Sequence, residues 1–485
     1  MKIFFVNPSF KSEYGKFSRE NRSPTVTRSG TLYYPLWLIY AAATCEKEGF
    51  DIEFLDAPAY PMNHEEQFRF IEEHGVGTKL FVINTSTPSI KNDTEVADKL
   101  KEKYPDSFVI LVGIHPSALP VETLTNSKNI DAVARHEYDY IVRDLAIALR
   151  DGTNPYKTLG ITYRLNGEIS SNQNMPYITK LDELPFLSEF VKNHLNYKDY
   201  FFAAGEYPEI QIFTGRGCMS RCNFCVYPQT MHGHGYRMRS AKNVVAELEY
   251  IASNFPDVKE IVFEDDNFTI DKDRVKEICQ LMIEKGLYKR FRWLCNARVS
   301  LDLETMKSMK KAGCHLIIPG IESGSQEILN NIKKGTKLEQ VYSYVKNAKK
   351  AGLQIHACYM VGNKGETKAT MQETLKLALQ LNTDTAQFYP LIPFPGTEAY
   401  FWAKENGFIQ GDYSDYVKED GTINCLLNLP NLSGEEMVNF CDYARKKYYM
   451  RPSYILHRLY MGLKDPADFK RSFKAFMNIK KYLFK

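Results

Sequence analysis

Residues 215–228 read GRGCMSRCNFCVYP and place Cys218, Cys222 and Cys225 at the spacing C-x₃-C-x₂-C. Three thiolates can bind three irons of a [4Fe–4S] cluster and leave the fourth iron without a protein ligand. That open iron offers a coordination position to a small molecule. The stretch therefore predicts an iron–sulfur site that takes part in chemistry.

Zinc and a disulfide are the plainer interpretations of these cysteines. Structural zinc usually takes four protein ligands, and His232 or His234 in the following run could supply the fourth. A disulfide would leave one of the three cysteines unpaired. The chain has ten cysteines, and those outside this stretch show no framework spacing, as expected of reduced thiols. We favour the cluster and keep zinc as the alternative.

The region from Ile210 to about Tyr400 repeats a pattern of strand, loop and helix. Its strand-like runs are IQIFTG, EIVFEDDNFT, RWLCNARVS, HLIIPGIESG, IHACYMVGNKGET and TAQFYPLIPFPGTEAY. Six such units predict a partial (β/α)₆ barrel. Its active site should lie at the mouth formed by the carboxyl ends of the strands, as in complete barrels.

The first 150 residues alternate strand-like and helical runs. Strands are predicted at 2–6, 51–57, 80–84, 108–113 and 130–134, and helices from Pro35 to Cys45 and over 91–104. The alternation predicts a doubly wound, Rossmann-like α/β domain that binds ligands at the carboxyl ends of its strands.

The domain boundaries follow from these patterns. We expect a first domain at 1–150, a linker with a hairpin at 151–204, the barrel at 205–405 and a helical, basic segment at 406–485. At 485 residues the chain exceeds what one core usually supports. The sequence contains neither a signal-peptide core nor a run of ~20 apolar residues, so we expect a cytoplasmic protein.

The C-terminal segment carries an excess of positive charge. From Arg445 to Lys485 the sequence has 12 Lys and Arg against Asp465 and Asp468, interleaved with aromatic and aliphatic residues. Such a segment can lie on an anionic membrane surface, so we consider peripheral membrane contact. The alternative is a tail that packs its aromatics on the barrel. No nucleic-acid recognition motif accompanies the charge, and we expect no nucleic acid partner.

Phe224, just before the third cysteine, completes the pattern C-x₃-C-x-Φ-C, in which Φ is aromatic. In this respect the segment closely resembles the radical S-adenosylmethionine (SAM) superfamily. The resemblance implies that SAM binds the open iron and that reduction of the cluster releases a 5′-deoxyadenosyl radical. It also implies an electron donor such as a flavodoxin, a ferredoxin or a reductase. The cofactor supplies the difficult chemistry and the protein positions it.

The same resemblance implies which residues contact SAM. They are Phe224, Tyr227, Asp265, Asn296, Arg298, Glu322 and Ser323. Phe224 and Tyr227 would flank the adenine, and Arg298 would pair with the SAM carboxylate. Glu264, Asp265 and Asp266 stand where many family members carry Gly-Gly-Glu, so a helix N-cap is the alternative there. For Arg298 the alternative is an interstrand ion pair.

The runs YYPLWLIYAAATCEKEGF and VGIHPSALP resemble the cobalamin-binding domain that precedes the radical domain in one radical SAM class. This resemblance implies that Ser86, Thr87, Gly113 and His115 lie at the cobalamin site. The loop NPSFKSEYG lacks the Asp-x-His-x-x-Gly motif of other cobalamin proteins, so no lower axial histidine is expected from it. Two alternatives remain open: His115 as an ordinary helix-entry residue, and a degenerate domain without cobalamin.

Within the superfamily, the runs from GRGCMSRCNFC to PFPGTEAY resemble the hopanoid-biosynthesis-associated radical SAM proteins with a cobalamin-type domain. That branch implies a lipid or isoprenoid-type substrate. His234 and Arg237 match a His and an Arg of the branch's post-cluster loop and are the candidate catalytic residues.

The expected function is functionalisation of an unactivated C–H bond, by cobalamin-dependent methylation or by rearrangement of the carbon skeleton. A tRNA methylthiotransferase is the radical SAM alternative, although it would need further cluster cysteines in a first domain that has only Cys45. A non-enzymatic iron–sulfur or zinc protein is the other alternative.

Overall fold

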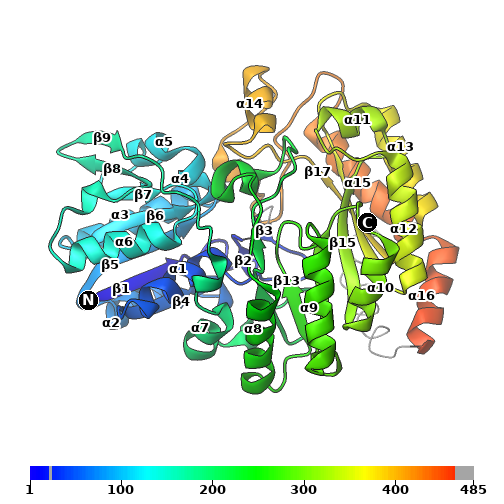
Figure 1. Ribbon diagram of the computed structural model, residues 1–485. Helices are drawn as coiled ribbons and strands as arrows, with labels where there is room; N and C mark the ends of the chain where they lie inside the picture. Colours follow the sequence, from blue (N-terminus) through cyan, green and yellow to red (C-terminus); the bar gives the residue numbers. More distant parts are fainter. Residues whose placement is uncertain (21–23, 465–485) are drawn as a thin grey trace.

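The computed structural model describes residues 1–20 and 24–464. Figure 1 shows an N-terminal sheet domain, coloured blue to cyan, beside a barrel domain, coloured green to yellow. None of the helices within the described ranges is long and apolar enough to cross a membrane.

Five parallel strands form the body of the first sheet. In spatial order they are β4 (Asp51–Asp56), β1 (Lys2–Asn7), β5 (Thr78–Thr85), β6 (Phe108–Gly113) and β7 (Ala132–Ala134). All five were predicted. The order is that of a flavodoxin-like sheet, whose ligand crevice opens at the carboxyl ends between β1 and β5.

The hairpin predicted in the linker is present but extends this first sheet. β8 (Ile161–Leu165) pairs antiparallel with β7, and β9 (Glu168–Ser171) pairs with β8. The turn between them holds Asn166 and Gly167, both with positive φ. The sheet therefore continues past residue 150, because an edge strand can be added antiparallel without a crossover helix.

Helices cover both faces of the first sheet. They are α1 (Leu36–Lys47), α2 (His64–His74), α3 (Ile90–Lys103), α4 (Ile114–Ala118), α5 (Pro120–Thr125) and α6 (Asp139–Arg150). α2 was not predicted, because only Gln67 and Ile71 of its side chains are buried and its apolar periodicity is weak. A capping box between Asn63 and Glu66 sets its start.

The second sheet is an open barrel of six parallel strands, as predicted. In order these are β10 (Glu209–Ile212), β13 (Glu260–Phe263), β14 (Arg292–Ala297), β15 (Cys314–Glu322), β16 (Gln354–Val361) and β17 (Thr385–Pro390). The outer helices are α8 (Ala241–Asn254), α9 (Lys272–Glu284), α10 (Leu303–Lys311), α11 (Gln326–Asn331), α12 (Leu338–Ala351) and α13 (Lys368–Leu381). The core between strands and helices buries Trp293, Tyr344 and Tyr359.

The remaining helices connect the domains and close the chain. α7 (Leu187–His194) precedes the barrel, and α14 (Glu398–Glu405), α15 (Gly434–Tyr449) and α16 (Pro452–Lys464) follow it. α15 packs on β17, where the Tyr449 hydroxyl donates to the Ala386 carbonyl at 2.7 Å. The C-terminal segment thus begins as part of the barrel fold. Residues 465–485, with 6 of the 12 Lys and Arg of the predicted basic tail, lie outside the described residues.

Candidate active site at the cysteine loop and the barrel mouth

The cysteine loop begins and ends at a short two-stranded hairpin. β11 (Gly215–Arg216) pairs antiparallel with β12 (Arg237–Met238), so the loop leaves and returns at one point. Gly217 turns the chain with a φ of +91°, and a Cβ there would lie 2.0 Å from the carbonyl oxygen of Gly235. Glycine fits this turn because the conformation disfavours L side chains and the space is filled.

Polar side chains fix the path of the loop through its backbone. Cys218 and Cys222 are buried and Cys225 is half-buried. His234 Nδ1 donates to the Ser220 carbonyl at 2.8 Å, and Gln229 Nε2 donates to the Cys225 carbonyl at 2.9 Å. Both contacts use carbonyl oxygens, so they hold the loop without engaging a thiol. His234, a candidate catalytic residue, thus has a loop-fixing contact.

The donor set of three thiols fits a cluster with one open iron. Among the described residues, no three His, Cys, Asp or Glu side chains converge as ligands of one metal ion. A [4Fe–4S] cluster needs no such convergence, because each cysteine binds a different iron. His232, considered for zinc, is paired through Nε2 with Asp266 at 2.6 Å, and its ring stacks with Tyr227 at 6.1 Å.

Arg298, Lys334 and Glu322 join the barrel mouth to the cysteine loop. One Arg298 nitrogen donates to Ser220 Oγ and another donates to the Lys334 carbonyl at 2.5 Å. Lys334 Nζ lies 2.7 Å from Glu322 Oε1, and both residues are buried. Burial alone would lower the pKa of Lys334, but the charges of Glu322 and Cys222 raise it. The lysine therefore keeps its positive charge beside the loop.

Glu322 ends strand β15 in a strained conformation. Its φ is +68°, which non-glycine residues adopt only infrequently and which often marks a functional site. Lys334, its partner, was missed by the sequence analysis. The lysine lies 12 residues after Glu322 in an ordinary-looking KKG run, and nothing in that pattern predicts the pairing.

The two residues predicted to flank the adenine contact different parts of the protein. Phe224 packs against the cluster of Ile328, Leu329 and Ile332 at α11. The Tyr227 hydroxyl donates to the backbone carbonyl of Glu20 in the N-terminal domain at 2.9 Å. Their joint contact with adenine stays a prediction.

Asp265, Asn296 and Ser323 each have a protein partner. The amide and hydroxyl of Thr214 both donate to the Asp265 carboxylate at 2.6 Å, and Asn296 Nδ2 donates to the Asp265 carbonyl at 3.1 Å. Ser323 Oγ lies 3.2 Å from Thr374 Oγ1 on α13. Contact of these residues with SAM stays a prediction. The N-cap of α9, the alternative for the acidic run, is instead Asp271.

Arg237, the other candidate catalytic residue, lies at the interface of the two domains. Its guanidinium makes a two-pronged contact with Glu137, with both N–O distances at 2.8 Å, and donates to the Ile178 carbonyl at 2.7 Å. These bonds occupy the guanidinium and join the loop to Glu137 and Ile178. A substrate contact stays a prediction.

A second arginine of the hairpin is held in the same way. Arg216 forms two 2.9 Å bonds to Asp139, both side chains are buried, and the guanidinium lies 4.4 Å from the Trp37 ring. Nearby, Ser117 Oγ donates at 2.5 Å to the carbonyl of Thr230, within the π-helix η5 (Pro228–His232). The carboxyl edge of the first sheet is therefore bonded directly to the segment that carries the cysteines.

The residues predicted for cobalamin gather at that carboxyl edge. Gly113 ends β6 with a φ of +117°, and a Cβ there would lie 2.3 Å from the Thr85 carbonyl oxygen. Ser86, Thr87 and His115 are buried beside it, and His115 Nδ1 lies 3.4 Å from Thr87 Oγ1. This edge of small and hydroxyl side chains fits the tail of a corrinoid nucleotide. Its individual contacts stay predictions.

His115, the histidine predicted for the cobalamin site, is buried and covered. Burial lowers the pKa of His115 to about 3, and its ring packs edge-on against Tyr413 of η7 (Tyr413–Tyr416) at 4.7 Å. In the loop after β1, Arg19 forms a buried 2.6 Å ion pair with Asp93. The sequence analysis did not predict this ion pair, because neither residue belongs to a recognisable motif.

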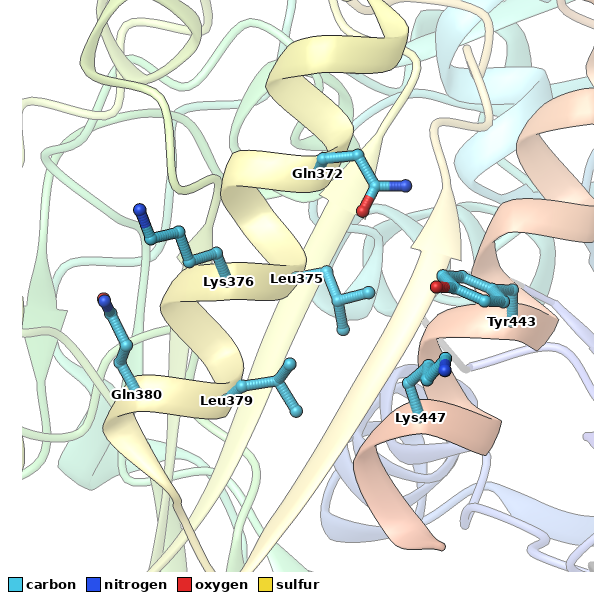
Figure 2. Close-up of a pocket in the computed structure, with 7 residues that line it drawn as sticks. All are labelled: Gln372, Leu375, Lys376, Leu379, Gln380, Tyr443 and Lys447. Atoms are coloured by element: carbon cyan, nitrogen blue, oxygen red, sulfur yellow. The ribbon is translucent and has the colours of Figure 1, made fainter. Parts of the chain in front are cut away.

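A separate pocket of about 420 Å³ lies on the outer side of the barrel between α13 and α15. Figure 2 shows Leu375 and Leu379 of α13 pointing toward Tyr443 and Lys447 of α15. The pocket does not include any residue of the cysteine loop or the barrel mouth.

A flavodoxin-like domain bonded to the cysteine loop of a partial barrel defines a two-domain radical SAM enzyme. The Radical SAM superfamily profile matches residues 212–378, and the B12 binding domain profile matches residues 22–146. An uncharacterized methyltransferase of Pyrococcus horikoshii is 30% identical over 433 residues, which cover 89% of this chain and 91% of that protein. The chain therefore belongs to the cobalamin-dependent radical SAM methyltransferase family.

Two solved structures share the complete two-domain fold. The radical SAM methyltransferase TsrM from Kitasatospora setae superposes with a TM-score of 0.67 at 17% identity, covering 87% of this chain and 84% of that chain. The cobalamin-dependent SAM radical enzyme OxsB gives a TM-score of 0.71 at 14% identity, covering 100% of this chain and 72% of that chain. The predicted fold class is confirmed.

Family membership also establishes the cofactors. A [4Fe–4S] cluster and SAM belong to the radical SAM domain, and cobalamin belongs to the B12 domain, as predicted. The protein is an enzyme whose chemistry is radical SAM methylation or rearrangement, and it requires a small-molecule substrate and an electron donor.

Proposed function

We propose that this enzyme transfers a methyl group from cobalamin to an unactivated carbon of its substrate. The supporting observation is the double clamp between the domains: Glu137 and Asp139, beyond β7, hold Arg237 and Arg216 of the cysteine hairpin. The clamp joins the cysteine loop to the carboxyl edge of the first sheet, the cobalamin edge of this proposal. When bound, the cluster and SAM supply a 5′-deoxyadenosyl radical and cobalamin supplies the methyl group.

In this proposal each residue at the mouth has a binding or positioning role. Cys218, Cys222 and Cys225 each hold one iron. Arg298 and Lys334 place positive charge beside the loop, where the SAM carboxylate would bind. The clamp keeps the two domains in contact beside the loop, and in the proposal this contact helps to keep water away from a reactive radical.

Anaerobic reconstitution tests the proposal. The protein is loaded with iron, sulfide and hydroxocobalamin and given SAM with a deuterated methyl group, a reductant and candidate substrates. Mass spectrometry should detect a product that carries the deuterated methyl group, together with 5′-deoxyadenosine. A product of rearranged skeleton without the label would replace methylation by rearrangement.

We further propose that cobalamin binds without a histidine lower ligand from the first loop. The first loop contains no histidine, and His115 is already paired with Thr87 and covered by Tyr413. Electron paramagnetic resonance of the cob(II)alamin form should lack nitrogen splitting from a protein histidine. Such splitting, lost in His115→Ala, would contradict the proposal.

The substrate is proposed to be lipid or isoprenoid-like, on the resemblance to the hopanoid-associated branch. The described part of the C-terminal segment supports contact with an anionic lipid surface. On α16 four apolar side chains share one helical face and are exposed: Leu456 at 66%, Leu459 at 49%, Tyr460 at 54% and Leu463 at 85%. The net positive charge of residues 445–485 would attract anionic headgroups.

Sedimentation with anionic liposomes tests this contact. The protein should pellet at low salt and be released at high salt, because salt screens the attraction. The triple variant L456Q/L459Q/L463Q should lose most of the binding. The matched control V76Q/V121Q changes exposed side chains of the first domain and should bind like the wild type. A wild-type protein that stays in the supernatant at low salt would refute membrane contact.

A further inference from the structure

Strands β16 and β17 expose a polar face to the inside of the barrel. On β16, Ile355, Ala357 and Tyr359 are buried, and on β17 Ala386 and Phe388 are buried. Phe388 lies 6.2 Å from the Tyr448 ring on α15, so this buried set faces the outer helices. Side chains alternate along a strand. The opposite, inner face therefore carries Gln354, His356, Cys358, Thr385, Gln387 and Tyr389.

These inner residues form a continuous wall that reaches the active site. His356 is paired in register with Thr385, and its Nδ1 lies 2.7 Å from Thr385 Oγ1. His356 Nε2 lies 3.4 Å from Gln387 Oε1, and Gln387 is exposed. At the mouth, Tyr389 donates to Glu322 Oε2 at 3.4 Å. The wall thus ends at a residue predicted to contact SAM.

The inner face of the neighbouring strands is covered differently. Val262 of β13, Leu294 of β14 and Leu316 of β15 pack with Phe202, against which Tyr33 also packs. An apolar plug from outside the barrel therefore fills the side of β13 to β15. Among the described residues of the wall of β16 and β17, only Tyr389, at the mouth, packs against an apolar cluster.

A buried amide also faces the interior from β10. Gln211 is paired in register with Val262, which places it on the inner face, and its side chain is fully buried. Neither its Oε1 nor its Nε2 has a hydrogen-bond partner within the part of the chain that the structure describes. A buried polar group without a partner is costly. This cost would be removed by a hydrogen-bonding ligand inside the barrel.

The wall is electrically neutral. The strands QIHACYMV and TAQFYP contain no Asp, Glu, Lys or Arg. Burial lowers the pKa of His356, so its imidazole is uncharged at neutral pH. The carboxylate at its end, Glu322, is already paired with Lys334. A charged ligand group placed against this wall would be desolvated without a counter-charge.

We infer that the inner face of β16 and β17 binds the substrate, and that the substrate presents an uncharged hydrogen-bonding group there, such as a hydroxyl or an amide. His356, Thr385 and Gln387 offer both donors and acceptors to such a group. This inference rests on the proposed methyl transfer for its reaction, but the wall itself is defined by the fold.

Thiol labelling tests whether the wall is open to small molecules. The holoenzyme, with its cluster in place, is treated anaerobically with the neutral reagent N-ethylmaleimide, and the modified peptides are mapped by mass spectrometry. Cys358 is half-buried, whereas Cys295 on β14 is buried. Cys358 should react at least tenfold faster than Cys295. Equal rates would overturn the inference.

A label-transfer assay tests the chemistry of the wall. A small-molecule extract of the organism that carries the gene is divided into compounds that pass both ion exchangers and compounds that are retained. With deuterated-methyl SAM, the holoenzyme should label compounds of the neutral fraction. Labelling of the charged fraction alone would overturn the inference. Labelling of neither fraction would refute the proposed methyl transfer, and the thiol-labelling result would then decide the wall separately.

Matched variants connect the label transfer to the wall. Gln387→Glu places a charge on the wall without changing its size, and it should reduce labelling of the neutral fraction at least tenfold, mainly by raising KM. His356→Ala should also reduce it. Gln372→Ala, in the outer pocket of Figure 2, is the control and should leave labelling unchanged. Iron content and cobalamin absorbance verify that each variant is loaded. Unchanged labelling by Gln387→Glu would contradict the inference.

Discussion

The cysteine loop is held from two sides by different kinds of contact. On the domain side, Arg216 is fully enclosed and paired with Asp139 across the interface. On the barrel side, Arg298 donates a hydrogen bond to Ser220 of the loop. Lys334 interacts with the loop through the negative charge of Cys222. The domain side sets where the loop lies relative to cobalamin. The barrel side sets the charge that SAM would meet. The contacts on the domain side are therefore expected to matter for the position of the loop, and those on the barrel side for SAM binding.

Removing one of the three cysteine thiolates should abolish both cluster binding and the cleavage of SAM. In Cys222→Ala the cluster loses one of its three protein ligands. We expect loss of nearly all bound iron and sulfide and no detectable 5′-deoxyadenosine. Cys441→Ala, at a buried cysteine far along the chain, is the control and should keep the cluster. Retention of cluster absorbance by Cys222→Ala would show that these cysteines are not its ligands.

Breaking the domain side should mainly cost stability. Arg216→Met leaves the carboxylate of Asp139 buried without its partner, which typically costs about 3–5 kcal/mol. Urea denaturation followed by fluorescence should show this loss. The control Lys91→Met breaks an exposed pair with Asp412 at 2.7 Å and should cost about 0–1 kcal/mol. Equal effects of the two substitutions would mean that the buried clamp does not hold the domains together.

A buried acid at the other end of the barrel sharpens the contrast, because it has no cation partner among the described residues. Burial, with the charge of Glu260 adding to it, raises the pKa of Glu209 to about 8. A raised carboxyl pKa means that the folded state holds the proton more tightly. The contribution of Glu209 to the free energy of unfolding is therefore largest below about pH 4.5 and is lost as the pH rises through 8. Glu209→Gln should remove this loss and be more stable than the wild type by roughly 2–4 kcal/mol at pH 8.5. Denaturation midpoints at pH 5 and pH 8.5 measure it, and equal pH dependence of both proteins would refute the assignment.

Breaking the barrel side should mainly affect SAM. Lys334→Gln keeps a hydrogen-bond donor for Glu322 but removes the positive charge beside the loop. We expect the KM for SAM in reductive cleavage to rise about tenfold, or about 1.4 kcal/mol, with a smaller change in kcat. Lys333→Gln, which breaks an exposed pair with Glu398, is the matched control. A fall in kcat with an unchanged KM would place Lys334 in the chemical step and not in SAM binding.

The sequence predicts the parts of this molecule that depend on local patterns. The barrel strands are apolar runs that end in polar or glycine residues, and the cysteine motif is contiguous, so both were found. The clamp was not found, because Arg216 pairs with a residue 77 positions away and Arg237 with one 100 positions away. The pairing of Arg237 with Glu137 could not be predicted, since an isolated arginine near a motif does not reveal its partner, and its catalytic role stays a prediction.

The cobalamin site and the inner face of the barrel depend on contacts between segments that lie far apart in the sequence. Ser86, Thr87 and His115 were placed at the cobalamin edge by resemblance, and the fold does bring them to one place. That Tyr413 would cover His115 could not be predicted, because the contact joins segments far apart in the sequence. The inner wall of β16 and β17 was also missed. Its polar residues were visible, but alternation alone does not say which face of a barrel strand is open.

The central claim is that the clamp brings the cobalamin edge and the cysteine loop together in one chain. Electron paramagnetic resonance of the reduced holoenzyme tests it most directly, by the microwave power needed to saturate the cob(II)alamin signal. A nearby reduced cluster speeds the relaxation of that signal. We predict that the signal saturates at higher power in the wild type than in Cys222→Ala, and at intermediate power in Arg216→Met. Identical saturation in the wild type and Cys222→Ala would contradict the account.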